Sequence, residues 1–306
     1  MVELRRLYEA TVGEDEIDHL GHMNVRFYFE KALRASHALA SEYDLSADAC
    51  RELGAVLEVR DNFARHYREQ LAGAKLVVMG GVIGADNDRL RFYHELINPE
   101  REERAATFVH ELGLRHRETG AALPLPSPIA KSAAESFVEW PEHGRPRTHD
   151  LDRVSKISLD LARERKLATR KVRVLDAEEC DEAGFFLSPN YQSLVWGGEP
   201  LERQTSDLPL HDMQDGGKFG WAALESRVVM LELPRVGARV QSFGAEVALA
   251  SKTSLRQMWV FDVDRGELLC SSSIVNLAFD IEARRAIEIP PAIRETLERD
   301  YHPDLR

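Results

Sequence analysis

Residues 18–43, DHLGHMNVRFYFEKALRASHALASEY, decide the fold of this chain. From Val25 onward, apolar residues recur at spacings of three and four, which predicts one long amphipathic helix over residues 25–43. No glycine or proline interrupts the stretch after Gly21. The preceding turn, Asp18 to Asn24, places a carboxylate beside backbone N–H groups that have no helical partner. An acid next to an oxyanion site is an arrangement suited to catalysis.

The same turn carries a motif. Asp18, Gly21, His22, Asn24 and Tyr28 form the pattern Asp-x-x-Gly-His-x-Asn followed by an aromatic helix. This pattern resembles the active-site loop of hotdog-fold thioesterases of the 4-hydroxybenzoyl-CoA thioesterase and acyl-CoA thioesterase group. The resemblance implies an α+β fold in which an antiparallel sheet wraps around a long helix. Members of the group usually have a second Asn directly after the first, and this chain has valine there.

Length and composition exclude several classes of protein. The chain has 306 residues, of which 40 are basic and 52 acidic, and its net charge of −12 argues against a nucleic-acid surface or a binder of anionic membranes. No apolar run approaches the ~20 residues that span a bilayer. The first twelve residues are typical of a strand rather than of a signal peptide. The odd, widely spaced cysteines Cys50, Cys180 and Cys270 indicate free thiols and a cytoplasmic protein.

The rest of the first half has the pattern of an antiparallel sheet. Residues 4–13 alternate as a strand. Four extended segments separated by turn-forming residues follow the helix, at residues 55–65, 74–85, 89–98 and 105–116. Residues 121–150 are interrupted by prolines and glycines, which indicates a connector. Apolar residues at helical spacing then predict a helix over residues 150–168.

The chain then repeats itself. DEAGFFLSPNY at residues 181–191 matches DHLGHMNVRFY at residues 18–28, and RVGARVQSFG at 235–244 matches LAGAKLVVMG at 71–80. RLRFYHELIN and SLRQMWVFDV also occupy equivalent places. Three matches in the same order at a nearly constant offset predict a tandem duplication.

Together with the resemblance, the repeat predicts a double hotdog that forms a pseudo-dimer. The expected parts are a first hotdog unit at residues 1–125, a connector with a helix at 126–170, and a second hotdog unit at 171–306. The second copy has lost the motif, because Phe185 stands at the position of His22 and Leu187 at the position of Asn24. A structural role is therefore favoured for Asp181, and we expect one intact and one degenerate site.

The resemblance assigns catalysis to Asp18, His22 and Asn24. Without it, local capping would be the preferred role of Asp18. With it, Asp18 attacks the thioester carbonyl or activates a water, and the sequence leaves both routes open. His22 and Asn24 orient water and substrate, although helix capping explains Asn24 nearly as well. Gly21 supplies backbone freedom, so that adjacent N–H groups can bind the thioester oxygen.

The substrate-binding positions expected from the sequence are Gly21, Met23, Tyr28, Asn62 and His94. Tyr28 would line the core and the pocket. Asn62 and His94 lie on strands that could face the helix, where most polar side chains simply face solvent. His19 and His22 have the spacing of a metal-ligand pair, but zinc needs further ligands and the cysteines form no paired motif. We expect no metal and no cofactor.

The function expected is therefore hydrolysis of an acyl-CoA or acyl-carrier-protein thioester, with no nucleic-acid or membrane partner and with scope for a homo-oligomer of pseudo-dimers. A non-catalytic acyl-CoA-binding module on the same fold is one alternative. A hotdog hydratase or dehydratase is another, although those enzymes use a different arrangement of Asp and His on the helix.

Overall fold

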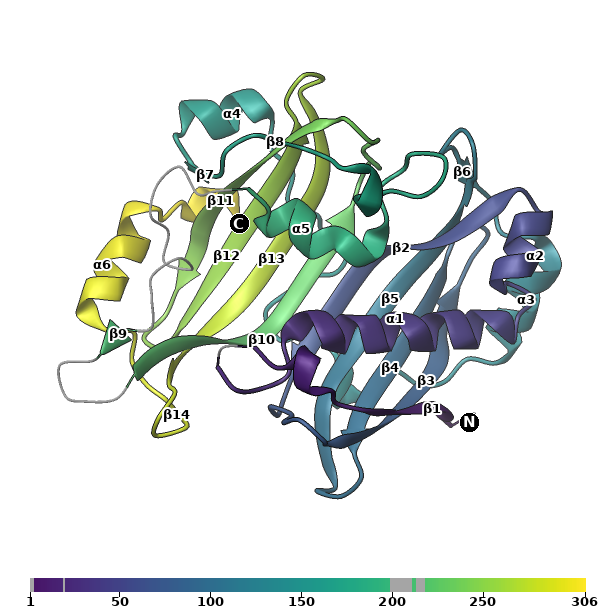
Figure 1. The fold of residues 1–306 in the computed structure, drawn as a ribbon, viewed down its shortest axis with the longest axis horizontal. Coiled ribbons are helices and arrows are strands. Elements are labelled where there is room, and N and C mark those ends of the chain that lie inside the picture. Colours follow the sequence, from purple (N-terminus) through teal and green to yellow (C-terminus); the bar gives the residue numbers. More distant parts are fainter. Residues whose placement is uncertain (1–2, 19, 199–210, 213–217) are drawn as a thin grey trace. The chain divides into compact units, whose positions relative to one another are not determined.

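The computed structural model describes residues 3–18, 20–198, 211–212 and 218–306. It divides into two units, Met1–Arg147 and Thr148–Arg306, and Figure 1 shows that each has a twisted sheet with helices on it. All three cysteines are free thiols. No helix in these described ranges is both long and apolar enough to cross a membrane.

The first unit has one antiparallel sheet with the strand order β1-β3-β4-β5-β2. Its strands are β1 (Arg5–Thr11), β2 (Ala55–His66), β3 (Lys75–Ala85), β4 (Leu90–Asn98), β5 (Glu103–His116) and the short β6 (Ala122–Leu123), which pairs with β5. The five strands expected from the sequence are confirmed. Turn-forming residues between the extended segments marked where the strands end.

Helix α1 (Val25–Ser41) lies across this sheet and packs on β1, β3, β4 and β5. The predicted helix is confirmed, and it ends two residues earlier than expected, with Glu42 as its C-cap. Its apolar stripe, including Phe29, Leu33 and Leu39, is buried. Lys31 is also buried, and its ammonium lies 2.5 Å from a carboxylate oxygen of Glu16, which ties the preceding loop to the helix.

A polar contact lies in the middle of this helix–sheet interface. The Ser36 hydroxyl is 2.8 Å from His94 Nε2 and 2.8 Å from His110 Nδ1. Burial lowers the pKa of His94 to about 3 and lowers the pKa of His110 well below its usual range. Both imidazoles are therefore neutral at pH 7. One hydroxyl can donate to one ring and accept from the other, so the contact is satisfied without charge.

Short helices connect and flank the strands. These are α2 (Ala47–Glu52), α3 (Ser127–Glu135), α4 (Leu159–Glu164), α5 (Tyr191–Trp196) and α6 (Pro291–Arg299). Single 3-10 turns lie at Glu14–Glu16, Glu142–Gly144, Ala177–Glu179, Ser188–Asn190 and Pro303–Leu305.

The helix expected over residues 150–168 is mostly absent. Only Leu159–Glu164 is helical, with the Ser158 hydroxyl accepting the Leu161 N–H at its start. The preceding backbone carbonyls are bonded to the sheet instead: Arg227 donates to the carbonyls of Asp150, Leu151 and Arg153. The helical prediction is wrong there because tertiary hydrogen bonds replace helical ones.

The second unit repeats the antiparallel order. Its long strands are β10 (Lys218–Met230), β11 (Arg239–Leu249), β12 (Thr253–Asp262) and β13 (Glu267–Asp280), arranged β10-β13-β12-β11. The short strands β7 (Ala168–Thr169) and β8 (Arg173–Val174) pair with β11, β9 (His211–Asp212) with β10, and β14 (Arg285–Ala286) with β13.

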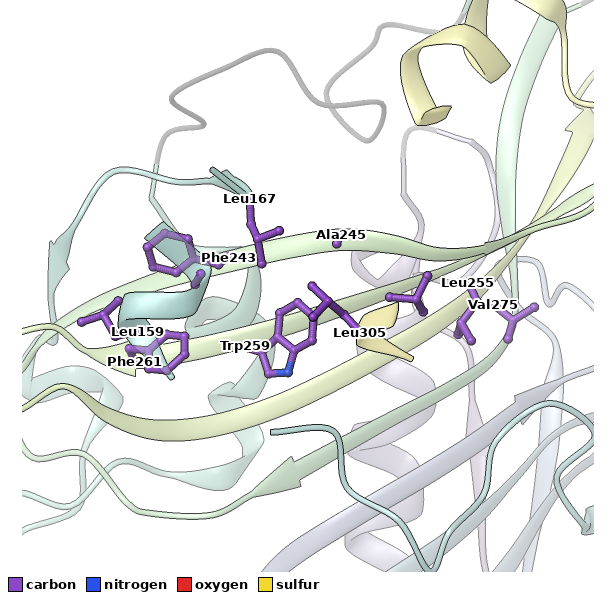
Figure 2. Packing of buried hydrophobic residues seen from close by; sticks show 11 residues of the cluster. Leu159, Leu167, Phe243, Ala245, Leu255, Trp259, Phe261, Val275 and Leu305 are labelled. Atoms are coloured by element: carbon purple, nitrogen blue, oxygen red, sulfur yellow. The ribbon is translucent and has the colours of Figure 1, made fainter. Parts of the chain in front are cut away.

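Both faces of the second sheet are covered. On one face, Leu194 and Val195 of α5 pack against Val228, Met258 and Cys270. On the other face, residues of the 157–167 segment and Leu305 pack against Phe243, Trp259 and Phe261, and Figure 2 shows Leu305 beside the Trp259 ring. A cavity also opens on this second face.

The buried imidazoles generate a prediction about acid stability. An imidazole whose pKa falls on folding takes up fewer protons in the native state, so stability is lost as pH falls from about 6.5 towards the native pKa. We expect urea unfolding to show a loss of up to about 1.4 kcal/mol per pH unit for each such group. His94→Gln should make the dependence on pH shallower between pH values of about 6 and 4. An unchanged slope would contradict a neutral His94.

Candidate functional site

The turn before α1 is held by its own backbone. The Asp18 N–H donates to the His22 carbonyl at 2.9 Å, and the Gly21 N–H donates to the Asp18 carbonyl at 3.0 Å. Gly21 has φ +82°, a left-handed conformation that favours glycine. The prediction that Gly21 supplies backbone freedom is therefore consistent with the geometry of the turn.

The Asp18 side chain is 14% exposed and points at the histidine of its own turn. Asp18 Oδ1 accepts the Leu20 N–H at 2.8 Å, and Oδ2 lies 3.7 Å from His22 Nδ1. His22 Nε2 lies 3.6 Å from Glu69 Oε1. The imidazole is therefore placed between two carboxylates, of which the sequence analysis found only one. Glu69 belongs to no sequence motif, and only the folded position of the loop after β2 shows that its carboxylate lies near His22.

The N–H groups of the turn are mostly occupied. Gly21 donates within the turn, Met23 donates to the Gln70 carbonyl at 2.7 Å, and Asn24 donates to the Glu16 carbonyl at 2.9 Å. Among the described residues, no acceptor is bonded to the N–H groups of His22 and Val25. The His22 N–H directly follows Gly21 in the chain, and the Val25 N–H belongs to the first residue of α1.

Asn24 is the N-cap of α1. Its Oδ1 accepts the Arg26 N–H at 2.9 Å. This bond satisfies one of the helix donors that would otherwise lack a partner. Met23, expected to contact substrate, is buried with 1% of its surface exposed.

Tyr28 is buried, and its hydroxyl is bonded on both sides. It donates to the Arg68 carbonyl at 3.2 Å and accepts the Gln70 N–H at 3.1 Å. Burial, and then the charges of Glu69, Asp18 and Glu103, raise the pKa of Tyr28 above its usual value. The phenol therefore stays protonated, and it anchors the loop that carries Glu69.

A neutral imidazole borders Tyr28. The His66 ring meets the Tyr28 ring edge-on, with 5.3 Å between centroids. Burial lowers the pKa of His66 to about 4, so the ring is neutral at pH 7. The wall of the site behind Asp18 is thus aromatic and uncharged.

Asn62 and His94 do not gather with Asp18. His94 is bonded to Ser36, which is eight residues, or about 12 Å along the helix, beyond Tyr28. Asn62 pairs in register with His110, the other partner of Ser36, and its Oδ1 has no partner among the described residues. These residues form a separate polar cluster under α1, for which the sequence analysis missed Ser36 and His110.

The corresponding turn of the second unit has the same backbone and different side chains. Asp181 N–H donates to the Phe185 carbonyl at 2.7 Å, Gly184 donates to the Asp181 carbonyl at 2.9 Å, and Gly184 has φ +81°. Asp181 Oδ1 accepts the N–H groups of Ala183 and Phe185. The Arg235 guanidinium lies 3.9 Å from the centroid of the Phe185 ring, which stands where the first unit has His22.

His19 lies outside the described residues. Within the described part of the chain, no group of three or more His, Cys, Asp or Glu side chains is placed to hold a metal ion.

Comparison with known proteins connects this turn to a family. Residues 12–137 match the thioesterase-like superfamily. Over 139 residues the chain is 34% identical to L-carnitine dehydrogenase/betainyl-CoA thioesterase of Agrobacterium fabrum, a match that covers 45% of this chain and 28% of that protein. The chain therefore spans less than a third of this curated relative. The resemblance stated from the motif is confirmed.

Solved structures extend the likeness over both units. A protein described as an oleoyl thioesterase from Lactobacillus plantarum superimposes with a TM-score of 0.67 at 11% identity, covering 90% of this chain and 96% of that one. The 12:0-ACP thioesterase from Umbellularia californica has a TM-score of 0.66 at 9% identity and covers 90% and 94%. At such identities the likeness concerns the fold alone, and it confirms the hotdog fold.

Substitution of Asn24 can distinguish a capping role, in which its side chain stabilises α1, from a catalytic role. Asn24→Ala should lower the free energy of unfolding by about 1 kcal/mol, because the Arg26 N–H loses its acceptor. Asn24→Ser should retain most of the stability, since serine caps as well. Urea unfolding and turnover are measured on both variants. A loss of turnover in Asn24→Ser without a loss of stability would assign Asn24 to chemistry.

Proposed function

Since residues 12–137 match the thioesterase-like superfamily, we propose that this chain is an enzyme that hydrolyses acyl-CoA or acyl-carrier-protein thioesters. The observation that carries the proposal is the turn before α1. There the Asp18 carboxylate lies 3.7 Å from the His22 ring, and the N–H groups of His22 and Val25, in the same turn and at the helix start, lack an acceptor among the described residues. An acid and two donors at one helix start are what thioester hydrolysis needs.

In this proposal the two N–H groups bind the thioester oxygen. Val25 is the first residue of α1, so its N–H lies at the positive end of the helix dipole, where a developing negative charge is stabilised. Asp18 takes a proton from a water that attacks the carbonyl, or attacks the carbonyl itself. In the first route Asp18 passes the water's proton to the leaving sulfur as the C–S bond breaks. In the second route the thiolate leaves and an anhydride forms on Asp18, and water then hydrolyses the anhydride and supplies the proton that the thiolate takes up, so both routes release acid and thiol. The reaction requires no cofactor.

His22 would position the acid. Its imidazole lies 3.7 Å from the Asp18 carboxylate and 3.6 Å from that of Glu69, and its Nδ1 is also 3.4 Å from the Met23 carbonyl, so the ring would limit the directions in which the Asp18 carboxylate can turn. The neutral His66 and Tyr28 rings behind the turn would then form an apolar wall against the acyl group. Met23 and Gly21 would contribute backbone rather than side chains.

We further propose that the chain is a double hotdog that arose by tandem duplication. Equal strand order in the two units supports this, as do the matching bonds of the Asp18 and Asp181 turns. In this reading the second turn is the degenerate copy, because Phe185 replaces the histidine. The three free thiols fit a reducing compartment, and we propose a cytoplasmic enzyme.

The proposal predicts a large difference between the two aspartates. Asp18→Asn preserves size and removes the charge, so release of thiol from a panel of acyl-CoAs should fall on the order of a hundredfold or more. Asp181→Asn is the matched control, since the same change falls on the same turn of the other copy. It should leave turnover within about threefold of the unchanged protein.

Three outcomes would count against the proposal. If no acyl-CoA or acyl-carrier-protein thioester releases thiol while calorimetry detects binding, the chain is a binding module. If Asp181→Asn abolishes activity and Asp18→Asn does not, the working site belongs to the other half. If enoyl-CoA is hydrated faster than any thiol is released, the reaction class is wrong.

A further inference from the structure

The second unit holds a cavity that the proposed thioesterase site does not use. Its volume is about 440 Å³, a size typical of small-molecule sites. It lies on the sheet face opposite α5, because Val228 and Cys270 face that helix while their neighbours Arg227 and Ser271 line the cavity. The segment from Thr148 to Ser155, which has no helix or strand and turns at residues 151–152, supplies six of the lining residues.

Three side chains at this cavity form a continuous hydrogen-bonded chain. Ser273 Oγ lies 2.8 Å from His149 Nε2, and His149 Nδ1 lies 3.2 Å from Glu225 Oε2. The side chains of His149 and Glu225 are 6% and 4% exposed. Hydroxyl, imidazole and buried carboxylate in this order are the arrangement of a Ser–His–acid triad, in which the imidazole takes the hydroxyl proton.

The carboxylate is fixed by more than the imidazole. Glu225 Oε2 also accepts the Thr148 N–H at 3.0 Å, which holds the backbone of the residue before His149. The carboxylate is thus bonded both to the ring and to the backbone beside it, which orients the imidazole so that Nε2 is directed at the serine. Glu225 is therefore a positioning residue.

Hydrogen-bond donors flank the serine on both sides. In the sheet register, Ser273 pairs with Arg227 on β10 and with Gln257 on β12, so the three side chains lie in one row on the same face. Both neighbours line the cavity. The Arg227 guanidinium donates to the carbonyls of Asp150, Leu151 and Arg153, and the Gln257 amide donates to Ser271, so what Arg227 offers an oxyanion formed at Ser273 is a fixed positive charge in the neighbouring position of the row.

Another serine in the same cavity has a different environment. Ser271 Oγ donates to the Ser155 carbonyl at 2.8 Å and accepts the Gln257 side-chain N–H at 2.9 Å. It binds backbone and amide, and it belongs to no imidazole–carboxylate chain. The hydroxyls of Ser271 and Ser273 lie on the same strand, and only that of Ser273 is bonded to an imidazole that could take its proton.

We propose that this cavity is a second acyl-transfer site, in which Ser273 is the nucleophile, His149 the base and Glu225 the positioning residue. Its substrate class is a small carboxylic ester or thioester that carries an anionic group. The walls combine the apolar Val229, Val247 and Leu255 with the exposed Arg153 and Arg306, which suits a short acyl chain next to a negative charge.

The reaction balances without a cofactor. Ser273 Oγ attacks the carbonyl carbon, its proton moves to His149 Nε2, and the bond to the leaving oxygen or sulfur breaks as that atom takes the proton. Water then attacks the acyl-serine, gives a proton to His149, and releases the acid as the proton returns to Ser273.

The test uses a fluorophosphonate, which reacts with activated serines, and the full chain. Intact mass and peptide mapping should find one adduct, on Ser273, in the unchanged protein and equally in Asp18→Asn. Ser273→Ala should give none there. His149→Gln should slow labelling on the order of a hundredfold or more. Ser271→Ala is the matched control and should be labelled at the unchanged rate.

A second readout tests the carboxylate. Glu225→Gln should slow labelling, and Glu225→Asp should restore part of the rate, because only a carboxylate stabilises the charged imidazole. Hydrolysis of p-nitrophenyl acetate by the Asp18→Asn protein should be lost with Ser273→Ala. Thermal unfolding checks that each variant is folded.

Two results would overturn the second site. One is a folded protein in which the fluorophosphonate leaves Ser273 unmodified. The other is labelling of Ser273 that proceeds equally in His149→Gln. Both measurements are made in the unchanged protein and in Asp18→Asn. Their outcome therefore does not depend on whether the thioesterase proposed for the first unit is active.

Discussion

The candidate site of the first unit depends on how the backbone before α1 is bonded. Met23 is bound to the loop after β2 through the Gln70 carbonyl, Asn24 is bound to the Glu16 carbonyl, and the turn closes on itself at Asp18. With these donors used, the remaining N–H groups at the helix start are fixed in direction. The backbone bonds fix the place of Asp18, and the Leu20 N–H and the His22 ring beside its carboxylate fix the orientation of the side chain, which is how a short motif can define a site.

The second unit illustrates the same constraint with other side chains. Phe186 donates to the Pro234 carbonyl and Leu187 donates to the Glu179 carbonyl, as Met23 and Asn24 do in the first unit. The turn of the second unit thus has the same backbone bonds, although Phe185 stands where the first unit has His22. Asp181 there accepts two N–H groups of its own turn, a structural task that needs no imidazole. Backbone bonding alone therefore explains why an aspartate and a glycine occur at equivalent places of both turns, and a catalytic role must be argued from the residues around them.

Local sequence patterns predicted the elements that are stabilised locally. The periodicity of α1, the alternation of the strands and the left-handed glycine turn each arise within a few residues, so the sequence carries them directly. The cluster of Ser36, His94 and His110 was invisible because its members come from three elements far apart in the chain. Glu69 was missed for the same reason. Such contacts depend on register and packing, which no single stretch encodes.

The helix predicted before Leu159 does not form, for a reason that also lies in contacts between distant residues. Its apolar spacing suited a helix. In a helix, however, the carbonyls would bond to N–H groups of the helix itself, whereas the buried Arg227 requires carbonyl acceptors from outside its own strand. Carbonyls of three connector residues supply them, and the Ser155 carbonyl accepts from both Trp259 and Ser271. A buried guanidinium thus competes with helical hydrogen bonds and prevails, because leaving it unpaired would cost more than a short helix gains. The non-helical backbone that results begins directly after His149, whose ring contacts Glu225 and Ser273.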